Sequence, residues 1–209
     1  MHSKILLSLL ACASLLTSPA FGGPLEDRLN KALTTLDSLK ADFKQTVLDD
    51  RNSVVQHSRG TVSIQRPGKF AWIYNDPYQQ KIISDGNELW VYDVDLDQVT
   101  VKPVDQGLAT APIMVLMKKG GIDQEFNISE IAQHKLLYWV ELEPKKQDME
   151  YARIQLGLNG ESIEAMQLVD TFGQKTQIVF ENLRRDVVFD PATFKFVPPE
   201  GVDVFGMGK

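Results

Sequence analysis

The pattern of hydrophobic positions changes its period once, near the start of the chain. Between residues 25 and 36, leucines and an alanine recur every three or four residues, with charged and polar side chains between them. This spacing predicts an amphipathic helix. From about Lys40 the period becomes two, which predicts strands. Ten strands are expected, at 41–48, 54–65, 69–75, 80–84, 88–93, 98–103, 135–143, 152–158, 163–170 and 175–181.

Turn sequences separate several of these strands. Asp85-Gly86-Asn87, Asn159-Gly160 and Phe172-Gly173 stand between strand-like runs and are typical of tight hairpins. Short strands joined by hairpins predict a largely antiparallel sheet whose strands follow the order of the sequence.

An apolar segment at 109–117 interrupts the strands. Pro112 stands near its start, and Lys118, Lys119 and Gly120-Gly121 follow its end. Proline in a first turn, lysine in a last turn and glycine just beyond are typical of a short helix. The expected architecture is mainly β, with one helix before the first strand and one in the middle of the chain.

Some expected strands are apolar on both faces. Phe70 and Trp72 alternate with Ala71 and Ile73, whereas an antiparallel sheet with one face in water alternates apolar with polar residues. Two interpretations fit the pattern. The sheet curls around helices and encloses an ordinary core, or it forms a concave surface that holds an apolar ligand.

The first 22 residues have the features of a secretory signal peptide. Lys4 precedes an apolar run at 5–16, and Ala20-Phe21-Gly22 fits the small-x-small cleavage rule. Cleavage is expected after Gly22, with Ala20 as the alternative. Residues 23–209 then form a single domain, and no later run reaches the roughly eighteen apolar residues of a membrane-spanning helix.

The charge and the cysteine content restrict the partners. The chain has 22 basic and 28 acidic residues, and Lys4 is the only charged residue within 1–22. A modestly acidic domain argues against nucleic acid or anionic membrane surfaces as the main partner. The single cysteine, Cys12, lies inside the signal peptide, so the mature domain is expected to be stable without disulfides.

Motifs for catalysis or for binding metals are missing from the sequence. His57 and His134 are far apart, and neither Gly-x-Ser-x-Gly nor His-Glu-x-x-His occurs. The acidic run at 93–97 imitates a calcium loop, but Gln98 replaces the turn glycine and Val104 the final glutamate. We therefore expect a non-enzymatic protein without a metal or cofactor, and interpret 93–97 as a hairpin tip.

Several motifs resemble the LolA family of periplasmic outer-membrane lipoprotein carriers. Three closely spaced runs carry most of the likeness, and the remaining matches extend it along the mature chain. The runs are Arg-Pro-Gly-Lys-Phe-Ala-Trp at 66–72, Ile-Ser-Asp-Gly-Asn-Glu-Leu-Trp-Val-Tyr-Asp at 83–93 and Leu-Asp-Gln-Val-Thr at 96–100. The other matches are Phe43-Lys44-Gln45, Pro112-Ile113-Met114 and the ending at 194–204.

The resemblance implies a fold and a set of partners. The implied fold is an incomplete, unclosed antiparallel β-barrel whose concave apolar face is capped by a helical lid. The implied cargo is the acyl chains of lipoproteins. The implied donor is the inner-membrane ABC transporter LolCDE, and the implied receptor is the outer-membrane protein LolB. A monomer in the periplasm of a Gram-negative cell would fit docking with two partners in turn.

The resemblance also implies roles for particular residues. The family's counterpart of Arg66 hydrogen-bonds carbonyls of the lid helices, so Arg66 is the expected lid-closing switch. The aromatic residues supply rigid apolar surface, and the methionines supply a surface that can repack around different acyl chains. The expected acyl-chain cavity is lined by Phe70, Trp72, Trp90, Pro112, Ile113, Met114, Leu116 and Met117.

Four other interpretations stay open at the level of sequence. The chain could be the receptor LolB, which requires a cysteine at the mature N-terminus, a position that Cys12 fits poorly. It could be another envelope half-barrel that binds lipid or glycolipid. It could be a periplasmic hydrolase, or a structural β protein with a filled core.

Overall fold

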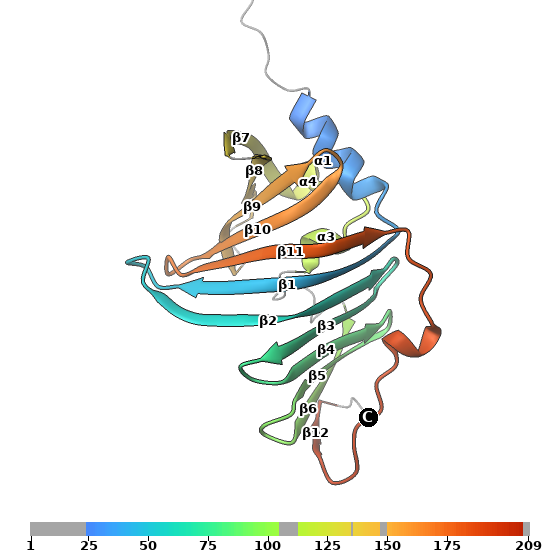
Figure 1. Cartoon of the computed structure of the whole chain (residues 1–209). Helices are drawn as coiled ribbons and strands as arrows, with labels where there is room; N and C mark the ends of the chain where they lie inside the picture. Colours follow the sequence, from blue (N-terminus) through green and yellow to red (C-terminus); the bar gives the residue numbers. More distant parts are fainter. Residues whose placement is uncertain (1–23, 105–112, 135, 147–149, 207–209) are drawn as a thin grey trace, which may run out of the picture.

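One curved sheet forms the body of the molecule, as the computed structural model shows for residues 24–104, 113–134, 136–146 and 150–206 (Figure 1). Two of its strands, β7 and β12, were not expected from the sequence. In chain order the strands are β1 Ser38–Leu48, β2 Val54–Gln65, β3 Lys69–Asp76, β4 Gln80–Asp85, β5 Glu88–Asp93, β6 Gln98–Pro103, β7 Phe126–His134, β8 Leu137–Pro144, β9 Tyr151–Asn159, β10 Ser162–Asp170, β11 Lys175–Arg185 and β12 Asp203–Phe205.

Within the described residues, four helical segments accompany the sheet: α1 Pro24–Thr34, α3 Met114–Met117, α4 Ile122–Glu125 and the 3₁₀ turn η2 Pro191–Phe194. The expected amphipathic helix is confirmed as α1, and its buried stripe includes Leu29 and Leu33. The expected central helix is confirmed over its last turn, α3. None of the helices in the described ranges has the length and apolarity needed to cross a membrane. The expected signal peptide, 1–22, lies outside the described residues.

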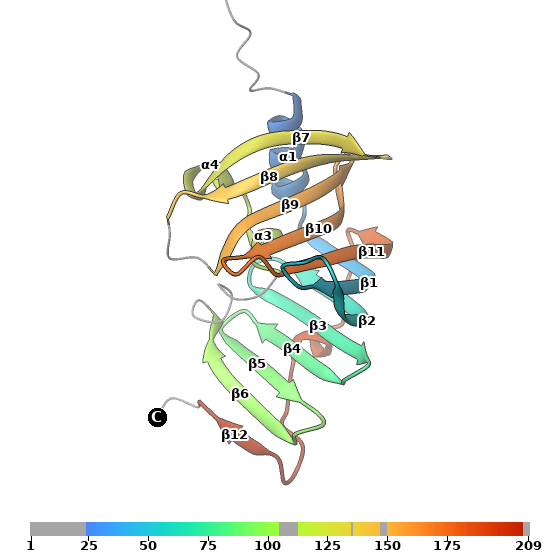
Figure 2. The ribbon, with the colours of Figure 1, turned by 90° about the vertical axis from the view of Figure 1, so that its left-hand side faces the viewer.

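The strand order differs from the order of the sequence. The sheet runs β12-β6-β5-β4-β3-β2-β1-β11-β10-β9-β8-β7. The chain therefore meanders from β1 to β6, crosses to the far edge at β7 and returns to β11, which pairs antiparallel with β1 (Figure 2). The expectation of sequence order was wrong at this crossover, because turn residues indicate only which neighbouring strands form hairpins.

The sheet remains open, because β12 and β7 stand at opposite ends of the strand order. β12 joins β6 as the only parallel pair among the described strands, and the chain reaches it after passing η2. The structure thus confirms a mainly β, unclosed sheet. Helices α1 and α3 cover one face.

The strands β3 to β6 carry apolar residues on both faces, because each face has its own cover. The inner face carries the main core, which includes Phe70 and Trp72 of β3 together with side chains of α1 and α3. On the outer face, Ala71 and Ile83 pack under Phe194 of the C-terminal segment. The chain from Phe189 to Val204 therefore covers the outer surface of β3 to β6. This second cover was not expected from the sequence.

Candidate functional site

Arg66 joins the two helices that cover the inner face. It lies in the turn between β2 and β3, and its side chain is 9% exposed. Its Nε donates to the carbonyl oxygen of Leu116 in α3 at 3.0 Å, and Nη2 donates to the same oxygen. Nη1 donates to the carbonyl oxygen of Leu33 in α1. One guanidinium therefore ties α1, α3 and the β2–β3 turn together.

The electrostatics of this arrangement follow from where the carbonyls lie. Leu33 and Leu116 belong to the last turns of their helices, where carbonyl oxygens lack partners within the helix and carry partial negative charge. Burial lowers the pKa of Arg66 to about 10; Asp37 opposes this shift and Arg185 adds to it. Arg66 still carries its charge near neutral pH, so it holds the helices through charge-assisted hydrogen bonds.

Most of the expected cavity residues lie together beneath this arginine. Phe70 and Trp72 of β3 are buried in one cluster with Ile113, Met114 and Leu116, and Met117 packs against that cluster. The ring centroids of Trp72 and Phe43 are 4.6 Å apart. In this closed arrangement, side chains of the lid helices fill the apolar inner face. Pro112 lies outside the described residues.

Trp90 lies on the opposite face of the sheet, and the structure corrects its expected place in the cavity. Directly paired residues of neighbouring strands share a face. Trp90 pairs with Ile83, which pairs with Ala71 on the outer face. The Trp90 ring lies 6.5 Å from that of Phe196, under the C-terminal segment. Period-two alternation in the sequence separates Trp90 from Leu89 but does not reveal which of them points inward.

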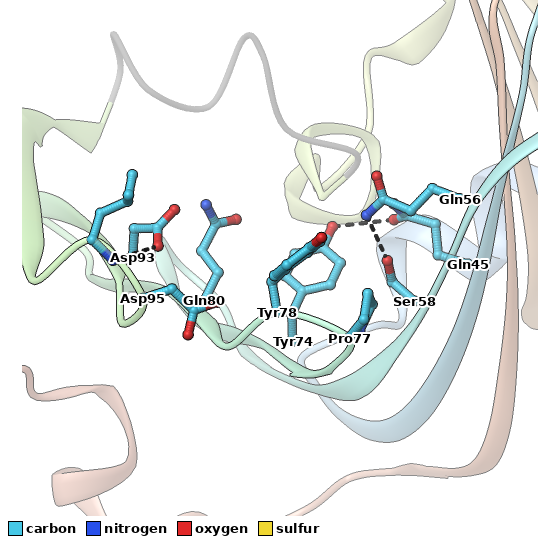
Figure 3. A pocket seen from close by; sticks show the side chains of 10 residues that line it. Gln45, Gln56, Ser58, Tyr74, Pro77, Tyr78, Gln80, Asp93 and Asp95 are labelled. Carbon is cyan, nitrogen blue, oxygen red and sulfur yellow. Dashed lines mark hydrogen bonds between the residues drawn. The ribbon is translucent and has the colours of Figure 1, made fainter.

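A polar pocket continues the inner face beyond its aromatic cluster (Figure 3). Its volume is about 480 Å³. This pocket was not predicted from the sequence. A signal for it exists: in strands, residues two positions apart share a face, so the polar Gln45 lies on the same face as the apolar Phe43. The lining residues are Gln45, Gln56, Ser58, Tyr74, Pro77, Tyr78, Gln80, Asp93, Asp95 and Leu96.

The described residues contain no group of three or more histidine, cysteine, aspartate or glutamate side chains placed to hold a metal ion. The acidic run at 93–97 forms the expected turn, between β5 and β6. His57 hydrogen-bonds through Nδ1 to the hydroxyl of Thr46 at 3.1 Å. The site therefore consists of an apolar surface that helices cover and a polar pocket beside it.

Comparisons with known proteins agree with this architecture. A protein from Methylococcus capsulatus called outer-membrane lipoprotein carrier protein is 41% identical over 180 residues, which cover 86% of each chain. One of the same name from Bordetella pertussis is 36% identical over 202 residues, covering 96% of this chain and 95% of its own.

Two further comparisons concern the fold and the family. An uncharacterized conserved protein from Thermus thermophilus shares the fold, with a TM-score of 0.53, 14% identity and coverage of 86% of this chain and 95% of its own. The family model described as outer membrane lipoprotein carrier protein LolA matches residues 34–197. Because that match spans most of the chain, and the two relatives match nearly their whole length, this protein belongs to the LolA family.

Proposed function

We propose that this protein is a periplasmic carrier that shields the acyl chains of lipoproteins on its inner face and carries them between two membranes. It accepts its cargo from the inner-membrane transporter LolCDE and delivers it to the outer-membrane receptor LolB. Membership of the LolA family and the names of the similar proteins support this role. A signal peptide at 1–22 would account for export.

The energetics of the cargo explain why a carrier needs such a surface. Each methylene moved from water to an apolar surface is worth about 0.8 kcal/mol, so a long acyl chain strongly resists release into water. Phe70, Trp72 and Phe43 provide a rigid apolar floor on the sheet. Met114 and Met117 can repack above it, since a thioether side chain adapts to partners of different shape.

The observation that carries the proposal is the placement of Arg66. The acyl chains and the side chains of α3 compete for the same inner face, because α3 fills that face in the closed molecule. Cargo entry therefore requires α3 to move and its hydrogen bonds with Arg66 to break. Reclosing of the lid recovers those bonds, which lowers the net affinity for cargo and favours its release to a receptor.

A release assay tests the carrier function. Proteoliposomes that contain LolCDE and a radiolabelled outer-membrane lipoprotein would receive ATP and purified residues 23–209. We expect the lipoprotein to appear in the soluble fraction as a complex with this protein. Lipoprotein that stays in the membrane, while a known carrier releases it under the same conditions, would rule out lipoprotein transport. The half-barrel would then be assigned to another lipid.

A further inference from the structure

The polar pocket and the apolar inner face form one continuous surface. Tyr74 of β3 pairs with Gly60 of β2, which pairs with Phe43 of β1, so all three positions face the same side. Tyr74 also pairs with Gln80, and Gln80 pairs with Asp93. The pocket is therefore the outer end of the same face on which Phe43 and Trp72 form the apolar floor.

Neutral hydrogen-bonding groups line the inner part of this pocket. The Tyr74 hydroxyl donates to Oε1 of Gln45 at 3.1 Å, and Nε2 of Gln56 donates to Oγ of Ser58 at 2.9 Å (Figure 3). Gln80 extends toward the same space. Amide and hydroxyl groups in this arrangement can donate to the carbonyl oxygens of esters and amides.

Tyr74 lies at the boundary between the pocket and the apolar floor. The Tyr74 ring lies 5.2 Å from that of Phe43 and 6.5 Å from that of Trp72, while its hydroxyl reaches Gln45 in the pocket. Burial raises the pKa of the Tyr74 hydroxyl, so the group is neutral near neutral pH. The boundary between the apolar floor and the pocket thus carries hydrogen-bonding groups without charge.

The outer part of the pocket is acidic. Asp93 and Asp95 line it, and none of its described lining residues is basic. Phosphate groups are bound by arginine, lysine or clustered backbone N–H groups, and two nearby carboxylates repel them. This pocket therefore has the wrong charge for an anionic phospholipid headgroup, while an uncharged ester or amide encounters no such repulsion.

We propose that the pocket receives the uncharged, carbonyl-bearing junction between the acyl chains and the polypeptide of the cargo, and that Asp93 and Asp95 exclude anionic phospholipids. This inference rests on the proposed carrier function and adds the basis of its selectivity. The pocket volume of about 480 Å³ lies within the roughly 300–1,000 Å³ of ordinary ligand sites. A carrier that works between two phospholipid membranes needs such discrimination, because acyl chains alone do not distinguish a lipoprotein from a phospholipid.

The test compares two probes with equal acyl chains. One is a synthetic N-acetylated cysteinyl lipopeptide with two palmitoyl chains and an uncharged peptide; the other is dipalmitoyl phosphatidylglycerol, and both are supplied from vesicles. The pocket variant combines Asp93→Asn with Asp95→Asn, which keeps the shape of the pocket and removes its charge. The new amide oxygen could still accept the hydrogen bond that Asp93 Oδ1 accepts from the backbone N–H of Leu96. The control variant combines Glu130→Gln, on the edge strand β7, with Asp186→Asn, directly after β11; both residues are exposed and neither lines the pocket.

We expect wild type to bind the lipopeptide in preference to phosphatidylglycerol. The pocket variant should bind phosphatidylglycerol roughly three- to tenfold more tightly, with lipopeptide binding unchanged, and the control variant should behave as wild type. If wild type binds lipopeptide while the pocket variant leaves phosphatidylglycerol binding unchanged, the selectivity inference fails and the carrier function stands. If wild type binds neither probe, both fail together.

Discussion

At the scale of single residues, Arg66 connects two helices through their backbone carbonyls. A lysine at this position would present one compact ammonium group, whereas the guanidinium reaches Leu33 and Leu116 from different nitrogens. Its partners are backbone carbonyls, so the contact does not depend on the side chains of the lid. The side chains of α3 can therefore vary without loss of these hydrogen bonds.

Replacing Arg66 with leucine should open the lid in the absence of cargo. The variant removes every donor to Leu33 and Leu116, and a hydrogen bond to a charged group contributes about 1.5–3 kcal/mol. We expect an apolar fluorescent dye to bind Arg66→Leu about tenfold more tightly than wild type.

Arg59→Leu is the matched control, because Arg59 is exposed and forms an ion pair with Asp76 on the surface, at 3.4 Å. It should bind the dye as wild type does. Equal dye binding by Arg66→Leu and wild type would show that Arg66 does not hold the lid closed.

Tyr151 should make the protein less stable at alkaline pH. Burial raises the pKa of Tyr151 to about 12 from an ordinary value of 10.0, with further contributions from Glu150, Tyr74 and Asp170. Between these values the folded protein keeps a proton that the unfolded chain releases, so this residue lowers the free energy of unfolding as pH rises. Burial lowers the pKa of Arg66, so Arg66 changes the free energy of unfolding in the opposite direction as pH rises.

The comparison with Tyr151→Phe isolates the tyrosine. Urea unfolding at several pH values should show the wild type losing stability relative to Tyr151→Phe above pH 10. Parallel stability curves for the two proteins would contradict the assigned shift.

Part of this site can be predicted from the sequence, and part cannot. Phe70 and Trp72 could be grouped because they alternate within one strand. Trp90 could not be assigned to a face, because that depends on strand register, and register is set by pairing across the whole sheet. The polar pocket was missed because Gln45 and Gln80 come from different strands and meet only after folding.

At the scale of elements, the C-terminal segment is a structural part of the half-barrel. η2 places Phe194 against Ala71 and Ile83 on the outer face, and Phe189 packs on Phe194 with ring centroids 5.1 Å apart. Without this cover, the outer surface of β3 and β4 would expose apolar side chains to water. The apolar residues on both sides of β3 and β4 are therefore explained by two covers: helices on the inner face and the C-terminal segment on the outer face.

Phe194→Ala should destabilise the protein by about 3–5 kcal/mol, because a buried aromatic ring is lost and a cavity remains. Phe172→Ala, at a side chain that is 87% exposed, is the matched control and should change stability by less than about 0.5 kcal/mol. Urea unfolding monitored by circular dichroism would measure both. A similar small effect for both variants would show that the segment does not stabilise the sheet.

Most elements could be predicted from local pattern, but their arrangement could not. The strands β2, β5 and β6 have the predicted bounds, since alternation and hairpin residues are local signals. The crossover from β6 to β7, and the return that pairs β1 with β11, depend on contacts between residues more than a hundred positions apart. β12 is only three residues long and offers too short a pattern to recognise.

At the scale of the whole molecule, the fold provides a face that can be either covered or loaded. The sheet is open between β12 and β7, and short helices rather than further strands complete the cover. A short helix that is held through a carbonyl of its last turn could move without disruption of the strand ladder. In the proposed mechanism, the open sheet is the stable scaffold, and closure of the lid competes with the cargo.

Handover of bound lipoprotein tests the role of the lid most directly. Soluble complexes of a radiolabelled lipoprotein with wild type, Arg66→Leu and Arg59→Leu would be mixed with membranes that contain LolB, and transfer to the membrane measured over time. We predict that wild type and Arg59→Leu transfer most of their cargo, while Arg66→Leu accepts cargo but retains it. Transfer by Arg66→Leu at the wild-type rate would contradict the claim that lid closure by Arg66 drives release.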